Sequence, residues 1–330
     1  MRTAARVTGR MNLAVALSMV VVLSGAVWGW SQTAPPDAQP GPSTAPVFLE
    51  PKPVFPGAKV VTLWPPGSPQ LKALPGYDKP EVFSMRRGSP GVVESVTNIS
   101  NPSIELHLAP PEKANGMAII VAAGGGNTTC NLGGEGTDIA LWLNSLGISA
   151  FVERYRLKPY SSAVDALADT QQCFRLVRAN AKEWNIDPKR LGIMGFSAGG
   201  EQSARVAMNF DAGDPSATDP VARESDRPDF TVLVYAGWAQ TGFSLANIPK
   251  NAPPAFCTVA GIDDMYHATQ TIDFVSAWLK AGIPTELHIY GHGGHANGIK
   301  PRGGIPFGTW QNRWVDWITD LGMMKPAAAK

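Results

Sequence analysis

RLGIMGFSAGGEQSARVAM, residues 190–208, joins an apolar strand pattern to an amphipathic helix pattern through a glycine–serine turn. The turn has the form Gly-X-Ser-X-Gly, with Ser197 between Gly195 and Gly199. Glycines two residues before and after the serine permit a turn so tight that the serine protrudes in a strained backbone conformation. The alternative is a glycine-rich turn that serves for packing or phosphate binding, which can have a similar sequence. The position between a strand and a helix favours a nucleophilic serine.

Apolar strand patterns and amphipathic helix patterns alternate along most of the remaining chain. Buried strands are predicted at 117–123, 148–157, 190–196, 231–237, 255–261 and 285–291. Helices are predicted at 137–147, 161–186, 267–282 and about 310–321. Segments 96–100 and 103–109 are expected to form an opening antiparallel pair, and the insertion at 211–228 is too short for a helical lid. The pattern predicts an α/β fold with a mostly parallel central sheet and helices on both faces.

The amino-terminal segment is typical of export. Three arginines precede the unbroken apolar run 11–27, so residues 1–30 are predicted to be a signal peptide with cleavage near 26–29. An uncleaved membrane anchor is the alternative. Residues 31–58 are rich in Pro and Ala and are expected to be a linker or arm, followed by a catalytic domain at 59–322 and a tail at 323–330. A secreted or periplasmic protein without stable membrane insertion after cleavage is therefore expected.

Composition excludes several classes of partner and cofactor. Net charge is +1 and no basic cluster is interleaved with aromatics, so nucleic acid is not expected as a partner. Hydrophobic residues make up 44% of the chain, which is enough for a large core. Cys130, Cys173 and Cys257 lack the Cys-X-X-Cys spacing of zinc and redox sites, and they allow one disulfide or none. No metal and no organic cofactor are predicted.

Donors for an oxyanion hole are expected in two places. AAGGGN, residues 122–127, directly follows a predicted strand, and its glycines allow backbone N–H groups to approach a ligand closely. The residue after the serine supplies a further N–H group. We therefore expect an oxyanion hole formed by Gly125, Gly126 and Ala198, although a run of glycines is also compatible with a flexible loop.

The acid and the base are expected after the last two predicted strands. In folds of this kind the chain order is serine, acid, histidine. AFCTVAG is followed by IDDMYH, so the acid is Asp263 or Asp264. TELHIYG leads into HGGHANG, which offers a loop histidine at the same edge of the sheet. A glycine-rich loop without rigid ligand spacing argues against a metal site here.

These motifs together resemble those of a known family. The stretches AAGGGN, ERYRL, DPKRLGIMGFSAGG, AGIDD and AGIPTELHIYGHGGHANG occur in this order and resemble the α/β-hydrolase esterases related to bacterial acetyl xylan and feruloyl esterases. The resemblance covers about 60–321 and implies Asp264 as the acid and His295 as the base. Ala123 stands where a His or Pro is usual, and Glu201 stands where a His is usual, so the loop's hydrogen bonding and the pocket are open to change.

The resemblance implies a secreted serine carboxylic-ester hydrolase of the short-acyl or carbohydrate-esterase type. Its expected substrate is an ester, such as an acylated plant polysaccharide. A prolyl-oligopeptidase-type peptidase and an inactive carbohydrate-binding relative are the alternatives. His288 is expected to be packed and His292 to be a solvated loop residue. Candidate pocket walls near the ends of the predicted strands are Trp238, Gln240 and Tyr266.

Overall fold

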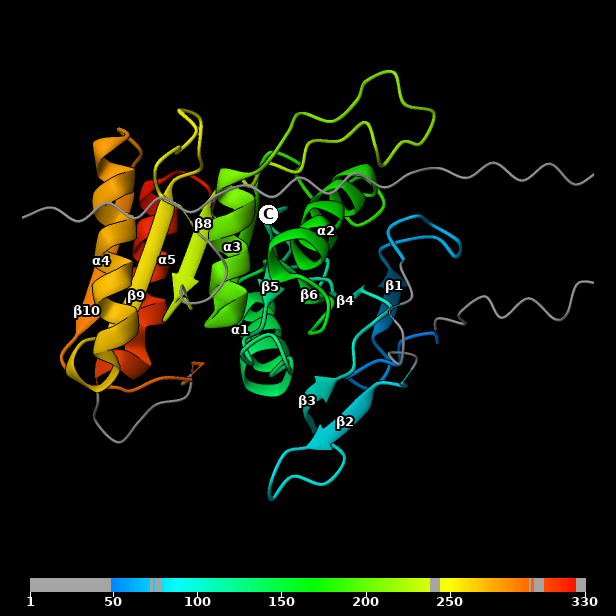
Figure 1. Cartoon of the computed structure of the whole chain (residues 1–330), viewed down its shortest axis with the longest axis horizontal. Helices are drawn as coiled ribbons and strands as arrows, with labels where there is room; N and C mark the ends of the chain where they lie inside the picture. The colour runs from blue at the N-terminus through cyan, green and yellow to red at the C-terminus, as the bar shows by residue number, and fades with distance from the viewer. Residues whose placement is uncertain are drawn as a thin grey trace, which may run out of the picture. The chain divides into compact units, whose positions relative to one another are not determined.

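An eight-stranded sheet dominates the computed structural model, which describes residues 49–71, 74, 79–237, 244–296, 298–299 and 306–324. The strand order is β1-β4-β6-β5-β7-β8-β9-β10 (Figure 1). β4 pairs antiparallel with both β1 and β6, and all pairs from β6 to β10 are parallel. The strands of this sheet are β1 (Lys59–Thr62), β4 (Ser103–His107), β5 (Ala118–Ala122), β6 (Ser149–Arg154), β7 (Leu191–Phe196), β8 (Thr231–Val234), β9 (Ala255–Ala260) and β10 (Thr285–Tyr290).

Helices cover both faces of this sheet, as predicted. The main helices are α1 (Asp138–Ser145), α2 (Leu167–Ala179), α3 (Ala198–Met208), α4 (Met265–Lys280) and α5 (Trp310–Asp320). In Figure 1, α3 and α4 lie in front of the strands and α5 lies behind them. On the α5 face, Trp142 of α1 contacts Trp310 and Trp314, with ring centroids 5.9 and 5.3 Å apart. The prediction of a mostly parallel α/β sheet is confirmed.

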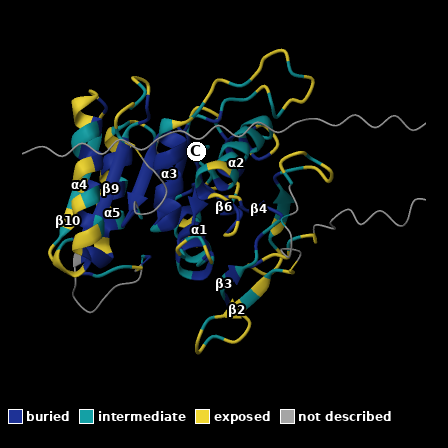
Figure 2. Ribbon diagram, viewed as in Figure 1, coloured by how far each residue is buried: buried dark blue, intermediate teal, exposed yellow. Residues whose placement is uncertain are grey.

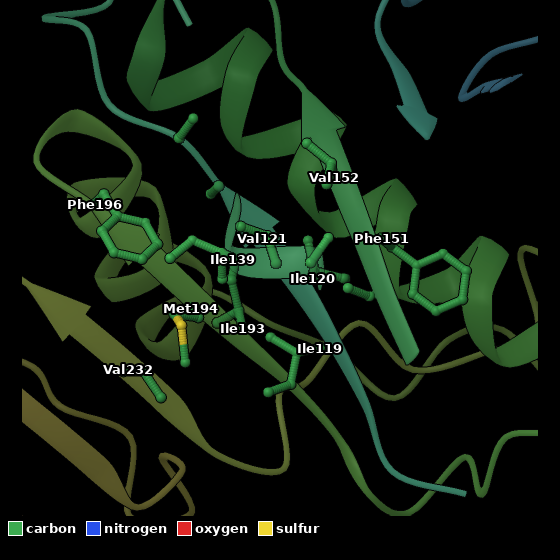
Figure 3. Close-up of a cluster of buried hydrophobic side chains, with 14 of the residues drawn as sticks. Ile119, Ile120, Val121, Ile139, Phe151, Val152, Ile193, Met194, Phe196 and Val232 are labelled. Atoms are coloured by element: carbon green, nitrogen blue, oxygen red, sulfur yellow. The ribbon is translucent and has the colours of Figure 1, made fainter. Parts of the chain in front are cut away.

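The core follows the central strands. β5, β6 and β7 are buried along their whole length, and Figure 2 shows buried residues concentrated along the sheet. Ile119, Ile193 and Phe151 are fully buried members of the cluster drawn in Figure 3. Branched apolar side chains fit strands that are covered on both faces. This core fixes the carboxyl ends of the strands from which the candidate site is built.

The predicted opening antiparallel pair is wrong. Segment 96–100 overlaps β3 (Val93–Thr97), which pairs with β2 (Val82–Met85) in a separate two-stranded sheet. Segment 103–109 contains β4, which joins the main sheet between β1 and β6. The chain passes from one sheet to the other at Asn101-Pro102. The partner of β4 is β1, which was predicted only as the start of the domain.

The predicted linker or arm, 31–58, contacts the domain at its carboxyl-terminal end. Val54 is buried, and the backbone N–H groups of Val54 and Phe55 donate to the Glu105 carboxylate at 2.5 and 3.1 Å. Glu105 lies on β4 and is itself buried, so its carboxylate needs these donors. The signal-peptide prediction, residues 31–48 of the linker and residues 325–330 of the tail lie outside the described residues. In the described part, no helix combines the length and apolar character needed to cross a membrane.

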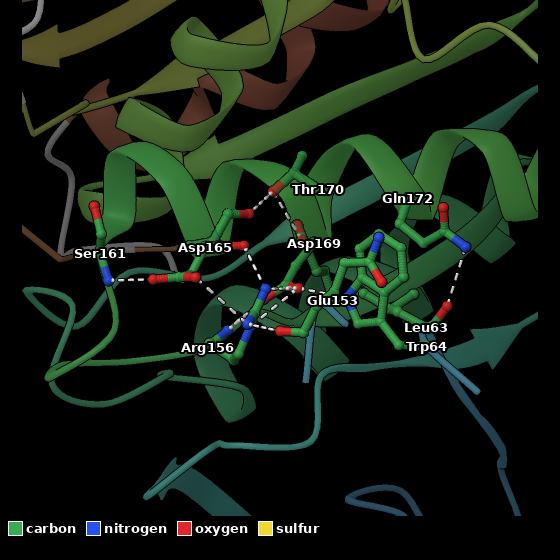
Figure 4. A network of polar contacts seen from close by, with 11 residues as sticks. Leu63, Trp64, Glu153, Arg156, Ser161, Asp165, Asp169, Thr170 and Gln172 are labelled. Atoms are coloured by element: carbon green, nitrogen blue, oxygen red, sulfur yellow. Dashed lines mark hydrogen bonds and ion pairs between the residues drawn. The ribbon is translucent and has the colours of Figure 1, made fainter. Parts of the chain in front are cut away.

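A buried ion pair and two hydrogen bonds hold α2 against the chain around β1 and β6. Arg156 donates to both oxygens of Asp169, with Nη2 2.8 Å from Oδ1 and Nε 2.9 Å from Oδ2 (Figure 4). The Trp64 indole donates to the same carboxylate at 2.8 Å. Glu153 accepts a hydrogen bond from Thr170 at 2.8 Å (Figure 4). These contacts therefore connect β6, α2 and the segment after β1.

The three cysteines are free thiols in the structure, each of them buried. Burial raises the pKa of Cys257, and likewise the pKa values of Cys130 and Cys173. A buried thiol with a raised pKa is a packing group and not a nucleophile. The sequence allowed one disulfide or none, and the structure has none.

Candidate active site

Ser197 lies at the sharp turn between β7 and α3. Its backbone adopts φ 51° and ψ −117°, which is an unfavourable conformation for a residue with a side chain. The Ser197 N–H donates to the Val234 carbonyl at 3.1 Å, and the Ser197 carbonyl accepts the N–H of Gly237 at 2.7 Å. A Cβ atom at Gly195 would collide with the Gly199 carbonyl. The motif glycines therefore make the strained turn possible.

His295 connects Ser197 with Asp264. His295 Nε2 lies 2.8 Å from Ser197 Oγ, and His295 Nδ1 lies 2.8 Å from Asp264 Oδ2. Ser197 follows β7, Asp264 follows β9 and His295 follows β10. These three strands are parallel, so their carboxyl ends lie at one edge of the sheet. The structure thus brings the serine, the acid and the base of the sequence hypothesis into one hydrogen-bonded chain.

The neighbouring Asp263 contacts the loop that carries His295, but at His292 and Gly293. Asp263 Oδ1 lies 3.2 Å from His292 Nδ1, and Asp263 Oδ2 accepts the Gly293 N–H at 2.9 Å. The His292 side chain is 69% exposed, compared with 32% for His295. Between the two acids that the sequence left open, Asp264 is the one that contacts His295.

His267 is a member of this cluster that sequence reasoning missed. Its Nδ1 lies 2.5 Å from Asp264 Oδ1, and its ring stacks on the His295 ring with centroids 4.2 Å apart and an interplanar angle of 19°. One carboxylate therefore contacts two imidazoles, one through each oxygen. The available signal was the spacing: His267 stands three residues after Asp264, in the first turn of α4, and residues three apart on a helix are neighbours.

The glycine loop after β5 lies against the serine. A Cβ atom at Gly124 would stand 2.7 Å from Ser197 Cβ, so this position requires glycine. Gly125 and Gly126 have φ of +134° and +62°. Among the described residues, no acceptor receives the backbone N–H of Gly125, Gly126 or Ala198. An oxyanion hole formed by these three donors stays a prediction.

The two departures from the family pattern have structural explanations. The Ala123 carbonyl accepts a hydrogen bond from the buried Tyr155 hydroxyl at 2.7 Å, which holds the start of the loop without a His or Pro. Glu201 is buried and pairs with Arg205 one turn later on α3, at 2.8 Å. Glu201 is therefore accommodated within α3 as half of an ion pair.

The predicted pocket walls are only partly described. Trp238 and Gln240 lie outside the described residues. Tyr266 is 51% exposed, and its ring meets the His267 ring edge-on at 5.0 Å between centroids. His288 is partly buried, contacts Glu286 at 2.6 Å and lies 5.4 Å from the Phe256 ring. The short insertion 211–228 begins beyond the end of α3 that is remote from Ser197, and its Asp211 and Asp226 pair with Arg175 of α2.

Asp264, His267 and His295 also offer ligand atoms that lie within 4.8 Å of one another, a spacing that a metal ion could use. Each carboxylate oxygen already faces an imidazole nitrogen, so hydrogen bonding accounts for the grouping. Ser197 Oγ and His295 Nε2 lie within hydrogen-bond distance, which proton transfer between them requires. The absence of a metal stays a prediction.

Comparisons with known proteins find similarity to esterases. The BD-FAE family model matches residues 104–232. The acetylxylan esterase of Xylanibacter ruminicola is 32% identical over 241 residues, which are 64% of this chain and 46% of that protein. Endo-1,4-beta-xylanase B of Butyrivibrio fibrisolvens is 29% identical over 204 residues, which are 54% of this chain and 32% of that protein. The chain thus spans less than half the length of these two curated relatives.

Solved structures extend the likeness over most of the chain. An acetyl ester-xyloside bifunctional hydrolase from Caldicellulosiruptor lactoaceticus superposes with a TM-score of 0.65 at 29% identity, covering 81% of this chain and 97% of that one. A thermophilic esterase from Thermogutta terrifontis, Est2, superposes with a TM-score of 0.58 at 17% identity, covering 83% of this chain and 96% of that one, and supports the fold alone. This chain has the α/β-hydrolase fold and is similar to esterases that share it.

Proposed function

We propose that this protein is a serine carboxylesterase that removes short acyl groups, acetyl above all, from carbohydrate. The observation that carries the proposal is the continuous chain from Asp264 through His295 to Ser197, with both hydrogen bonds at 2.8 Å. A serine hydroxyl is a weak nucleophile until a base accepts its proton. An oriented imidazole next to Ser197 supplies that base.

In the proposed mechanism, His295 accepts the Ser197 proton while Oγ attacks the ester carbonyl carbon. The tetrahedral oxyanion receives hydrogen bonds from the N–H groups of Gly125, Gly126 and Ala198. The imidazolium then donates its proton to the leaving alcohol, which leaves an acyl group on Ser197. His295 next activates a water molecule, and the carboxylic acid departs with Ser197 restored.

The carbohydrate substrate is supported by the relatives. One relative is named an acetylxylan esterase, another is named a xylanase, and a similar solved structure is named an acetyl ester-xyloside bifunctional hydrolase. The exposed Tyr266 ring next to His267 offers an apolar surface for a sugar face. We therefore propose acetylated xylan as the substrate class, with Trp238 and Gln240 as further pocket candidates.

Export from the cytoplasm is part of the proposal. Residues 1–30 have the charged start and apolar run of a signal peptide. Secretion or a periplasmic location would give the enzyme access to polysaccharide. Amino-terminal sequencing of the mature protein should find its first residue just after position 26–29, whereas an intact Met1 would contradict cleavage.

The decisive variant is Ser197→Ala. It should lower kcat on p-nitrophenyl acetate by at least ~10³-fold, because the covalent route is lost. A loss of less than about tenfold would sink the assignment. Acetate release from acetylated xylan, measured beside ferulate release, then tests the substrate class. Faster hydrolysis of long-chain esters than of acetate and butyrate esters would overturn the short-acyl proposal.

A further inference from the structure

Glu135 lies directly behind the glycine loop. It belongs to the short helical segment Gly133–Thr137 and is only 4% exposed. Its Oε2 accepts the backbone N–H of Gly124 at 2.7 Å. A Cβ atom at Gly124 would stand 2.9 Å from this oxygen and 2.7 Å from Ser197 Cβ. Gly124 is thus the residue that lies between the Glu135 carboxylate and the candidate nucleophile.

The second oxygen of Glu135 connects to the histidine loop. Oε1 accepts the Tyr235 hydroxyl at 2.8 Å, and the same hydroxyl oxygen accepts the Gly298 N–H at 2.9 Å. The Gly298 carbonyl in turn accepts the Trp310 indole N–H at 2.9 Å. Gly298 stands three residues after His295, and the Tyr235 ring lies 4.9 Å from the His295 ring. The Glu135 carboxylate therefore contacts the glycine loop directly and the His295 loop through Tyr235.

Maintaining this carboxylate in the interior is costly. Burial raises the pKa of Glu135, because a low-dielectric surrounding disfavours the charged form. Tyr235 carries a further cost, since its φ of +39° is unfavourable for a residue with a side chain. Glu135 and Tyr235, which carry these two costs, make hydrogen bonds to the two loops. Neither residue contacts Ser197 Oγ in the proposed chemistry.

We propose that Glu135 and Tyr235 are positioning residues that hold the glycine loop and the His295 loop in a fixed position relative to each other. The pair sets where the Gly125 and Gly126 N–H groups stand relative to His295 Nε2. An oxyanion donor and a base must act on the same carbonyl group, and a displacement of about 1 Å lowers the rate by about 100-fold. This inference rests on the proposed esterase function and adds two residues to it.

The test uses Tyr235→Phe and Glu135→Gln. Phenylalanine keeps the ring beside His295 but removes the hydroxyl that joins Glu135 to Gly298. Glutamine keeps the volume but turns an NH₂ donor toward Gly124 N–H or toward the Tyr235 hydroxyl. We expect each variant to lose about 10- to 100-fold in kcat on p-nitrophenyl acetate, with KM changed by less than about threefold. The double variant should lose less than the product of the two single losses, because both break one connection.

Glu153→Gln is the matched control, because Glu153 is also a buried glutamate but contacts Thr170 on α2. Its kcat should stay within about threefold of wild type. Binding of a trifluoromethyl ketone, which forms a tetrahedral adduct with the serine, should weaken in Glu135→Gln and Tyr235→Phe by the factor lost in kcat.

Two results would overturn the positioning role while leaving the esterase proposal intact. One is a wild-type enzyme with Ser197-dependent turnover whose Glu135→Gln and Tyr235→Phe variants keep kcat within about threefold. The other is a kcat loss in Glu153→Gln equal to theirs, since the disturbance of any buried polar contact would then lower kcat. Wild-type protein without Ser197-dependent turnover would instead overturn the esterase function, and the positioning role with it.

Discussion

Two aspartate–histidine pairs stand side by side on the same two loops, and they differ in burial and in the next partner of the histidine. In the inner pair, the Asp264 side chain is 8% exposed and His295 continues to Ser197 Oγ at 2.8 Å. In the outer pair, the Asp263 side chain is 39% exposed and His292 is 69% exposed. The proposed chemistry therefore requires more than an acid next to an imidazole. Contact with Ser197 Oγ and a lower exposure to solvent distinguish the inner pair.

The largest expected effect comes from exchanging the two histidines for alanine, one at a time. His295→Ala removes the proposed base and should lower kcat on p-nitrophenyl acetate by at least ~10³-fold. His292→Ala should leave kcat within about threefold, because an exposed imidazole contributes little. Steady-state kinetics with both variants checks this. Similar losses in the two variants would remove the distinction between the pairs.

The two acids should differ in the same direction. Asp264→Asn leaves the shape intact but loses the acceptor that fixes the His295 tautomer, so we expect kcat to fall by ~10³- to 10⁴-fold. Asp263→Asn keeps one oxygen for the Gly293 N–H and should cost less than about tenfold. The pair of kcat values is the measurement. An Asp263→Asn loss larger than that of Asp264→Asn would reverse the assignment of the acid.

A smaller effect is expected at His267, which contacts the inner pair without contacting Ser197 in any described interaction. His267→Ala removes one hydrogen-bond partner of Asp264 and the ring stacked on His295. A partly exposed hydrogen bond of this kind contributes about 1 kcal/mol, so kcat should fall by about fivefold. Unchanged kcat across pH 6 to 9 would show that the inner pair functions without His267.

The smallest effect on activity is expected at Glu153, a buried carboxylate with no histidine partner among its described contacts. Burial raises the pKa of Glu153 from 4.5 to about 8. Between these values the folded state keeps a proton that the unfolded chain releases, so stability falls as pH rises, by about 1.4 kcal/mol per pH unit within that window.

Glu153→Gln should remove this dependence on pH. Relative to wild type, the variant should gain unfolding free energy between pH 5 and pH 8, measured by urea denaturation, while kcat stays within about threefold. Comparing the two proteins at each pH cancels the contributions of other groups. Parallel stability profiles would contradict the raised pKa.

The fold and the grouping of Ser197, Asp264 and His295 were predictable because they depend on local patterns. The apolar strand at 190–196 and the Gly195–Gly199 turn follow from residues adjacent in sequence, and chain order places an acid and a histidine at the same sheet edge. The partners of β4 were not predictable, since Pro102 separates segments that pair with different, distant strands. Glu135 and Tyr235 were missed for a similar reason. Their contact joins residues 100 positions apart and has no spacing signature.

The most direct test of the central claim is covalent labelling by a fluorophosphonate, followed by mass spectrometry of the proteolytic peptides. We predict a single adduct on Ser197 in the wild-type protein and no adduct in Ser197→Ala. Labelling should be slowed by at least ~10³-fold in His295→Ala and by less than about threefold in His292→Ala. An adduct on another residue, or equal labelling of Ser197 with and without His295, would contradict the proposed triad.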